Sequence, residues 1–268
     1  MASIDLDIAA DLQQQVAAAY AHKTPLNIRA GNTKAFYGRA VAGEVLDVAA
    51  HVGIISYEPT ELVLTARAGT PLRVIEAALA AQGQMLACEP PHLGAQATIG
   101  GTVACNLSGP RRAYAGSTRD FLLGCHVLNG KGERLHFGGE VMKNVAGYDA
   151  SRLMCGALGT LGVLLDVSLK GLPGPSADMT MVLSVPDIDA ALLQMNQLAG
   201  QAMPLSASAW VDGHLYLRYS GSVGTMDAIR QKQSGDVLEN AAEFWQSVRE
   251  LQHDYFASPR PLWRIAMP

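Results

Sequence analysis

Glycine is concentrated in one stretch of the chain, and this limits the possible folds more than any other feature of the sequence. The stretch 94–162 holds 14 of the 27 glycines in about a quarter of the 268 residues. Glycine weakens helices and strands, but it allows positive φ angles and a close approach of the backbone to a ligand. We interpret the stretch as a set of tight turns or as backbone wrapped around a large, flat cofactor. Its main phrases are Ala97–Gly101, Lys143–Asp149 and Gly156–Gly162.

Composition and charge exclude several classes of protein. A hydrophobic content of 49% and a charged content of 16% indicate a sizeable core rather than a disordered chain. The net charge is −4 and no basic stripe suggests nucleic acid. The first 175 residues carry 14 acids and 14 bases. If this part holds a phosphorylated cofactor, we expect backbone N–H groups to do much of the binding.

Cysteine spacing and apolar run length give further limits. The four cysteines form no C-x-x-C pair, which argues against a zinc ribbon or an iron–sulfur cluster in this chain, and we expect no metal. No apolar run reaches the roughly 18 residues of a membrane span. The N-terminus lacks the pattern of a signal peptide. We therefore expect a cytoplasmic protein, or one peripheral at the inner face of the cell membrane.

Periodicity and turn residues predict two α+β parts. The sequence Leu172–Pro175 reads as a boundary, because two prolines and a glycine interrupt the chain there. The second part has the order β-α-β-β-α-β, which is typical of a ferredoxin-like unit. Helices are predicted at 8–21, 70–83, 99–106, 151–157, 187–198, 225–232 and 239–255. Apolar residues recur at Ile8, Leu12, Val16 and Ala19 in the first helix, and Thr70 and Thr98 are expected to cap the second and third. The segment 108–119 has too many turn formers for regular structure, and 122–128 and 133–137 are expected to form a β-hairpin. Strands are predicted at 25–29, 45–48, 53–57, 61–66, 122–128, 133–137, 163–169, 179–185, 206–211, 214–219 and 262–267.

The common cofactor and nucleophile motifs are absent. The spacing G-x-x-G-x-x-G at Gly156, Gly159 and Gly162 precedes a strand, so it does not fit the Rossmann fingerprint for NAD. No P-loop sequence, no G-x-S-x-G and no H-E-x-x-H occurs. The loop 30–34 follows a predicted strand and is rich in small residues, so its N–H groups could form a concave anion site.

Five motifs in a fixed order resemble those of one flavoprotein family. They are R-x-G-N-T, A-T-I-G-G-x-x-A-x-N, Y-x-G-x-x-R-D, K-N-x-x-G-Y-D and G-T-L-G-V. The chain resembles flavoproteins of the vanillyl-alcohol oxidase / p-cresol methylhydroxylase type, and among these the FAD-binding E subunits of bacterial glycolate oxidase (glycolate dehydrogenase). The resemblance implies an α+β fold: a two-subdomain FAD-binding domain at 1–175, followed by a ferredoxin-like cap domain at 176–268 that is incomplete at its C-terminal end.

The resemblance also implies where FAD would bind. The first loop would hold the pyrophosphate, the A-T-I-G-G segment would form a second wall, and a turn near the flavin and a last glycine-rich segment would complete the site. The residues expected to bind the cofactor are Arg29, Ala30, Gly31, Asn32, Thr33, Lys34, Pro91, Thr98, Ile99, Gly100, Gly101, Ala104, Gly116, Arg119, Asp120, Gly159, Leu161, Gly162 and Val163.

Two departures from the family pattern affect the expected chemistry. Some relatives tether the flavin through a histidine near the first loop, whereas this chain has Asn32, Thr33 and Lys34 there, so non-covalent FAD is expected. Related dehydrogenases use a histidine-rich cap segment with a metal to bind the hydroxy acid, and that segment is missing. The catalytic residue is therefore unassigned. His92 is the best candidate for a general base, ahead of His214 and His253.

The expected function is that of an FAD-binding subunit in a glycolate (2-hydroxy acid) oxidase complex, which converts glycolate to glyoxylate. Its expected partners are a sister FAD subunit and an iron–sulfur subunit, and any contact with the membrane would be peripheral. One alternative is a stand-alone FAD-dependent dehydrogenase of another small hydroxy acid or alcohol. Others are a structural flavin-binding subunit without turnover, and a protein in which the glycines only make turns and no cofactor binds.

Overall fold

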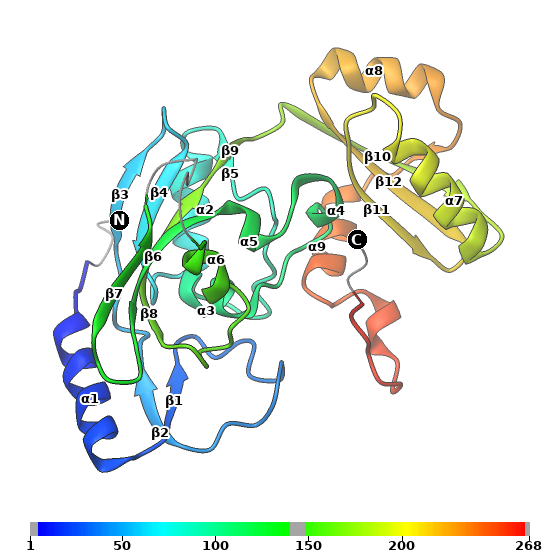
Figure 1. Ribbon diagram of the computed structural model, residues 1–268. Coiled ribbons are helices and arrows are strands. Elements are labelled where there is room, and N and C mark those ends of the chain that lie inside the picture. The colour runs from blue at the N-terminus through cyan, green and yellow to red at the C-terminus, as the bar shows by residue number, and fades with distance from the viewer. Residues whose placement is uncertain (1–4, 140–147, 266–268) are drawn as a thin grey trace. The chain divides into compact units, whose positions relative to one another are not determined.

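The computed structural model describes residues 5–139 and 148–265 (Figure 1). The predicted loop segment 143–147 lies outside these residues. The chain divides into two compact units: the first falls within Met1–Ser108 and Gly116–Gly174, and the second within Gly109–Ala115 and Pro175–Pro268. The short segment Gly109–Ala115 therefore packs with the second unit, whereas the sequence places it in the FAD-binding domain.

A five-stranded antiparallel sheet forms the centre of the first unit. Its strand order is β3-β4-β8-β6-β7. The central strand β8 is buried from Val163 to Leu169, which confirms the prediction from its apolar sequence. The predicted hairpin is also confirmed. The bounds are β3 Ile54–Glu58, β4 Val63–Arg67, β6 Leu122–Leu128, β7 Arg134–Gly138 and β8 Val163–Lys170.

A small parallel sheet lies beside the N-terminal helix. Helix α1 (Ala9–His22) buries Ala9, Leu12, Val16 and Ala19. The helical period of the sequence predicts Leu12, Val16 and Ala19, but it places Ile8 on this face in place of Ala9. Strand β1 (Leu26–Arg29) pairs in parallel with β2 (Glu44–Asp47). The segment that joins them contains the predicted cofactor loop. A second short pair, β5 (Gln84–Met85) and β9 (Leu172–Pro173), was not predicted.

The helices of the first unit confirm one predicted cap and correct another. Helix α3 (Ile99–Cys105) begins as predicted, with the Gly101 N–H donating to Thr98 Oγ1 at 3.2 Å. Helix α2 (Leu72–Ala80) has Pro71 at its N-cap, so the prediction that Thr70 caps it is wrong. The Thr70 hydroxyl instead pairs with the Gly53 backbone, accepting from its N–H at 3.0 Å and donating to its carbonyl at 3.1 Å.

Short helices occur where the sequence indicates none. The segment 108–119 was expected to lack regular structure, but it contains α4 (Arg112–Ala115) and the start of α5 (Thr118–Phe121). Each is a single turn, and Asp120 stabilises the second by accepting from the Ser117 N–H at 2.7 Å and hydroxyl at 2.8 Å. Such single turns are stabilised by local hydrogen bonds, and the sequence shows no helical repeat of apolar residues that would predict them. Helix α6 (Ala150–Met154) lies near the start of the described range 148–265.

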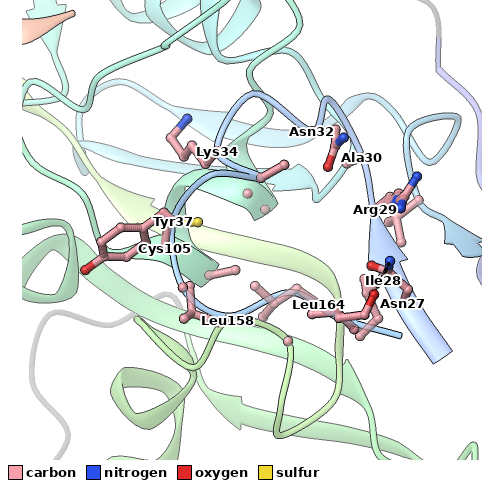
Figure 2. A pocket seen from close by; sticks show the side chains of 18 of the residues that line it. Asn27, Ile28, Arg29, Ala30, Asn32, Lys34, Tyr37, Cys105, Leu158 and Leu164 are labelled. Atoms are coloured by element: carbon pink, nitrogen blue, oxygen red, sulfur yellow. Dashed lines mark hydrogen bonds between the residues drawn. The ribbon is translucent and has the colours of Figure 1, made fainter. Parts of the chain in front are cut away.

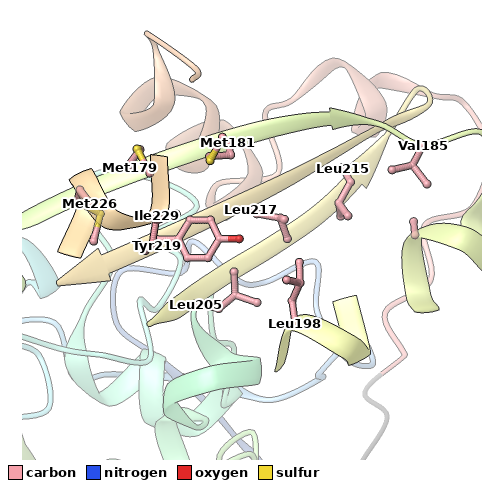
Figure 3. Packing of buried hydrophobic residues seen from close by; sticks show 11 residues of the cluster. Met179, Met181, Val185, Leu198, Leu205, Leu215, Leu217, Tyr219, Met226 and Ile229 are labelled. Carbon is pink, nitrogen blue, oxygen red and sulfur yellow. The ribbon is translucent and has the colours of Figure 1, made fainter. Parts of the chain in front are cut away.

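The second unit has the predicted β-α-β-β-α-β order. Its sheet order, β11-β12-β10-β13, is that of a ferredoxin-like fold. Figure 3 shows the Tyr219 ring among Leu198, Leu205 and Leu217 in its core. The elements are β10 Ala177–Ser184, α7 Ile188–Ala199, β11 Leu205–Val211, β12 His214–Gly221, α8 Val223–Lys232 and β13 Asp236–Val237.

The last strand and the last helix of the second unit differ from the prediction. The fourth strand is β13, because the chain turns at Gly235 (φ 124°) directly after α8 and pairs with β10. The described residues 262–265 form no strand and are exposed. The predicted helix 239–255 is shorter, with α9 at Ala241–Arg249 and a 3₁₀ turn at Asp254–Ala257.

Polar side chains occupy the face of the second sheet opposite its core. The Trp245 indole of α9 donates to Thr180 Oγ1 at 2.8 Å, and the Arg218 guanidinium lies 5.1 Å from the centre of the indole. On the core face of the sheet, Tyr114 of the segment Gly109–Ala115 packs against the hydrophobic cluster, and its Oη donates to Ser208 Oγ at 2.9 Å. Side-chain hydrogen bonds therefore hold this segment on the second unit.

The N-terminal segment is attached to the first unit through a buried histidine. The Ile8 N–H donates to His51 Nδ1 at 3.2 Å, and the His51 side chain is only 2% exposed. The acceptor nitrogen must be unprotonated for this bond to form. Asp7 and Arg67 lie beside the ring, and Arg67 also pairs with Asp5.

We expect stability to fall at mildly acidic pH because of His51. Burial lowers the pKa of His51 below its ordinary value of 6.5, the nearby Asp7 and Asp166 carboxylates oppose this, and Arg67 and Arg134 add to it. The unfolded chain therefore binds a proton that the folded chain does not, so this contribution is present above pH 6.5 and is lost as the pH falls through the folded pKa.

Urea denaturation at pH 7.5 and 5.5 tests this prediction. In His51→Asn the amide oxygen can accept from Ile8 without titrating. The wild-type chain should lose more unfolding free energy between the two pH values than this variant does. An equal loss in the two proteins would contradict the assignment.

Candidate functional site

A cavity of about 700 Å³ in the first unit is the candidate functional site (Figure 2). Its size is within the range of ligand and cofactor pockets. Three segments line it: the end of β1 with the loop that follows, the start of α3, and the loop before β8. The sequence predicted all three, and the structure brings twelve of the predicted residues together: Arg29, Ala30, Gly31, Asn32, Thr33, Lys34, Thr98, Gly100, Gly101, Ala104, Gly159 and Gly162.

The first wall is the loop after β1. Asn32 takes a left-handed conformation (φ 52°), and the Ala35 N–H donates to the Asn32 carbonyl at 3.3 Å, so the chain turns sharply. A Cβ atom at Gly31 would lie 1.6 Å from the Gln96 carbonyl oxygen. Only glycine fits there, because the loop is pressed against the backbone that leads into α3.

The second and third walls are joined by backbone hydrogen bonds. Helix α3 lies so close to the end of β4 that a Cβ atom at Gly100 would be 2.6 Å from the Ala68 Cβ. The loop before β8 attaches to the other end of α3, with the Leu158 N–H donating to the Ala104 carbonyl at 2.9 Å. Both walls are therefore fixed to the same short helix.

His92 holds the first loop through its backbone. Its carbonyl oxygen accepts from Thr33 Oγ1 at 2.8 Å and from Lys34 Nζ at 3.1 Å. Its ring nitrogen Nε2 lies 2.8 Å from Glu76 Oε2 on α2. The ring does not line the cavity. This geometry favours a positioning role for His92 over the predicted catalytic one.

The charge of the cavity lining suits an anion. Among the described residues that line it, Arg29, Lys34 and Arg39 are the charged ones, and all three are cations. The arginines are exposed, whereas Lys34 is 7% exposed. Side-chain cations therefore supplement the backbone N–H groups, although the charges of the first 175 residues balance.

Seven residues of the predicted set do not line the cavity. Ile99 of α3 and Val163 of β8 are buried in the core. Val163 is buried because side chains alternate between the two faces of a strand, and its neighbours Gly162 and Leu164 line the cavity. Arg119 is exposed. Asp120 accepts hydrogen bonds from Ser117. Burial acts to raise the Asp120 pKa, but these hydrogen bonds oppose it and the pKa is lowered. The structure thus does not bring the following predicted residues into the cavity: Pro91, Ile99, Gly116, Arg119, Asp120, Leu161 and Val163.

The sequence reasoning missed other lining residues. The loop after Lys34 continues along the cavity, and its small residues were a signal that could have extended the prediction. Cys105 also lines the cavity, and burial raises the pKa of its thiol. Lining residues without a prior assignment include Asn27, Ile28, Ala35, Tyr37, Gly38, Arg39, Ala40, Val41, Val48, Ala68, Met154, Ala157, Leu158, Thr160 and Leu164.

Metal-binding clusters and membrane-spanning helices are both absent from the described parts of the chain. Over residues 5–139 and 148–265, no three His, Cys, Asp or Glu side chains are placed so as to hold a metal ion. Over the same residues, every helix is too short or too polar to cross a membrane.

Comparison with known proteins shows the family to which the chain belongs. Residues 6–138 match the FAD binding domain family. The chain is 49% identical to the glycolate oxidase subunit GlcE of Escherichia coli over 98% of its own length and 75% of the relative. A solved structure of alkyldihydroxyacetonephosphate synthase matches 92% of this chain and 54% of that one, with a TM-score of 0.68 and 16% identity, and so supports the fold alone.

More distant relatives match a smaller share of the chain. It is 32% identical to D-2-hydroxyglutarate dehydrogenase of Xanthomonas citri pv. viticola over 52% of this chain and 29% of that one. It is 27% identical to D-lactate dehydrogenase of Anaerostipes hadrus over 71% of this chain and 44% of that one. The chain therefore spans less than half the length of either dehydrogenase.

The fold and the site define a flavoprotein with an FAD-binding domain of the p-cresol methylhydroxylase type. Within this class of FAD-dependent oxidoreductases, the chain belongs to the family of the glycolate oxidase subunit GlcE. FAD is its cofactor, and the cavity fits FAD. The walls of small residues allow close backbone contact with a flat ring, and the two exposed lining arginines, Arg29 and Arg39, complement a pyrophosphate.

We expect Gly31→Ala to weaken FAD binding by at least roughly tenfold, because the new methyl group forces the loop away from Gln96 and so out of register with α3. Gly130→Ala is the matched control, since no atom lies within 4 Å of a Cβ at that position. Fluorescence titration of the apoprotein with FAD measures both affinities. If Gly31→Ala bound FAD as tightly as the wild-type chain, the role of this loop would be refuted.

Proposed function

We propose that this chain is an FAD subunit of a glycolate-oxidising complex, in which glycolate is converted to glyoxylate and electrons pass to an iron–sulfur partner subunit. The observation that supports this most strongly is the 49% identity to the GlcE subunit over 98% of the chain. The bound flavin supplies the hydride and electron chemistry, and the protein supplies its position and electrostatic surroundings.

The residues of the cavity are proposed to hold FAD without a covalent bond. The first loop contains no histidine, and its Thr33 and Lys34 side chains are directed to the His92 carbonyl. The proposed contacts are the twelve predicted residues that line the cavity. The exposed Arg29 and Arg39 are suited to the pyrophosphate, as are the N–H groups of the loop.

The cysteines support transfer of electrons to a different subunit. The spacing of the four cysteines matches no iron–sulfur cluster motif. An iron–sulfur carrier would therefore have to belong to a partner.

We further propose that the hydroxy acid is oxidised mainly on a sister flavin subunit, and that the FAD of this chain relays electrons. This rests on the histidine-rich cap segment that related dehydrogenases carry and this sequence lacks. The alternative of a stand-alone dehydrogenase is favoured by one observation, the similarity to D-lactate and D-2-hydroxyglutarate dehydrogenases.

Anaerobic reduction of the FAD-loaded chain separates these possibilities. We expect glycolate or D-lactate to reduce the isolated chain far more slowly than the complex turns over, and to reduce its FAD at the turnover rate within the complex. Reduction of the isolated chain at a catalytic rate would support the stand-alone dehydrogenase instead. FAD that stays oxidised while the complex works would indicate a structural subunit.

His92→Gln tests the role of the leading catalytic candidate. The His92 ring lies away from the cavity lining, so we expect the kcat of the fully FAD-loaded complex to stay within about threefold of wild type. The ring contacts Glu76 and so helps to position the first loop, so we expect the variant to bind FAD more weakly. Loss of a general base would instead lower kcat by roughly 10²–10⁴-fold. Steady-state kinetics at saturating FAD distinguish the two, and a loss of that size would restore the catalytic assignment.

A further inference from the structure

Lys34 differs from the other two cations of the cavity in its burial. Arg29 and Arg39 are exposed, so water and salt screen their charges. The Lys34 side chain is 7% exposed, and its ammonium is held 3.1 Å from the His92 carbonyl oxygen and 3.4 Å from Thr33 Oγ1. A charge fixed in a partly dry wall acts over a longer distance than one at the surface.

The field of this ammonium reaches the lining of the cavity on α3. Figure 2 shows Lys34 and Cys105 among the labelled residues around the cavity, on two different walls. Burial raises the pKa of the Cys105 thiol, and the charge of Lys34 counteracts this rise. A ligand between these walls experiences the same positive field.

FAD gains negative charge when it is reduced. Transfer of a hydride brings two electrons and one proton from the hydroxy acid, directly or through another flavin, so the ring system gains one net negative charge. The lining of the cavity, as far as the structure describes it, contains no carboxylate to oppose this charge. A buried cation in the wall must then favour the reduced cofactor over the oxidised one.

We propose that Lys34 sets the reduction potential of the bound FAD, and that the cofactor phosphates are held by Arg29, Arg39 and the N–H groups of the loop instead. The proposal rests on the proposed function only in that the FAD of this chain is redox-active. Lys34 acts on the cofactor through its charge, without donating or accepting a proton in the reaction.

The test compares variants that remove or keep the charge. Lys34→Met removes it at similar length, Lys34→Gln is a second neutral variant in case the first does not fold, and Lys34→Arg keeps it. Lys131→Met, at an exposed position in the hairpin turn, removes the charge of a residue that does not line the cavity. The potential of the isolated FAD-loaded chain is measured against reference dyes without any hydroxy acid.

We expect the neutral variants to lose about tenfold in their preference for reduced FAD, which is a potential lower by about 30 mV for a two-electron couple. Lys34→Arg and Lys131→Met should stay close to wild type. An unchanged potential in the neutral variants would overturn the proposal. So would complete loss of FAD binding in both neutral variants with retention in Lys34→Arg, because Lys34 would then serve to hold the cofactor.

The same measurement is independent of the proposed glycolate activity. A chain that never oxidises glycolate can still show the lower potential, and a normal potential in Lys34→Met leaves the glycolate assignment intact. The two proposals can therefore fail separately.

Discussion

The contact between α3 and the end of β4 is the interaction on which the cofactor site depends. The Gly100 N–H donates to the Ala68 carbonyl at 2.8 Å, and the Ala68 N–H donates to the Leu165 carbonyl of β8 at 2.8 Å. A single methyl group at position 100 would not fit between helix and strand. The helix is thereby fixed to the centre of the sheet, and the loop before β8 is fixed to the helix. The walls keep their spacing because rigid backbone, rather than flexible side chains, sets it.

Local signals in the sequence predicted most of this arrangement. The small-residue loop, the Thr98 cap and the glycines at 159 and 162 each mark a segment where the backbone approaches a ligand, and all of them line the cavity. The motifs predicted which segments line the cavity more accurately than they predicted which side chains face it. Thr98 and Gly100 face the cavity, while Ile99 between them is buried, and a motif alone does not indicate which residues face inward.

The incorrect predictions arose where distant contacts decide the structure. Thr70 has the sequence of a helix cap, but its hydroxyl bonds Gly53, which is far away in the chain. The apolar run at 262–265 has the composition of a strand, but β13 already occupies the position beside β10. In both cases the local pattern was correct as a propensity, and a tertiary contact overrode it.

The placement of Gly109–Ala115 in the second unit has a topological consequence. The chain passes between the units at 108–109, 115–116 and 174–175, so neither unit is one continuous stretch of sequence. A gene fragment that ended at Gly174 would leave Arg111 without its hydrogen-bond acceptor Ser220 and Tyr114 without Ser208. Exchange of the second unit between relatives by recombination would therefore require two segments to be exchanged together, which ties the evolution of this short insert to that of the cap sheet.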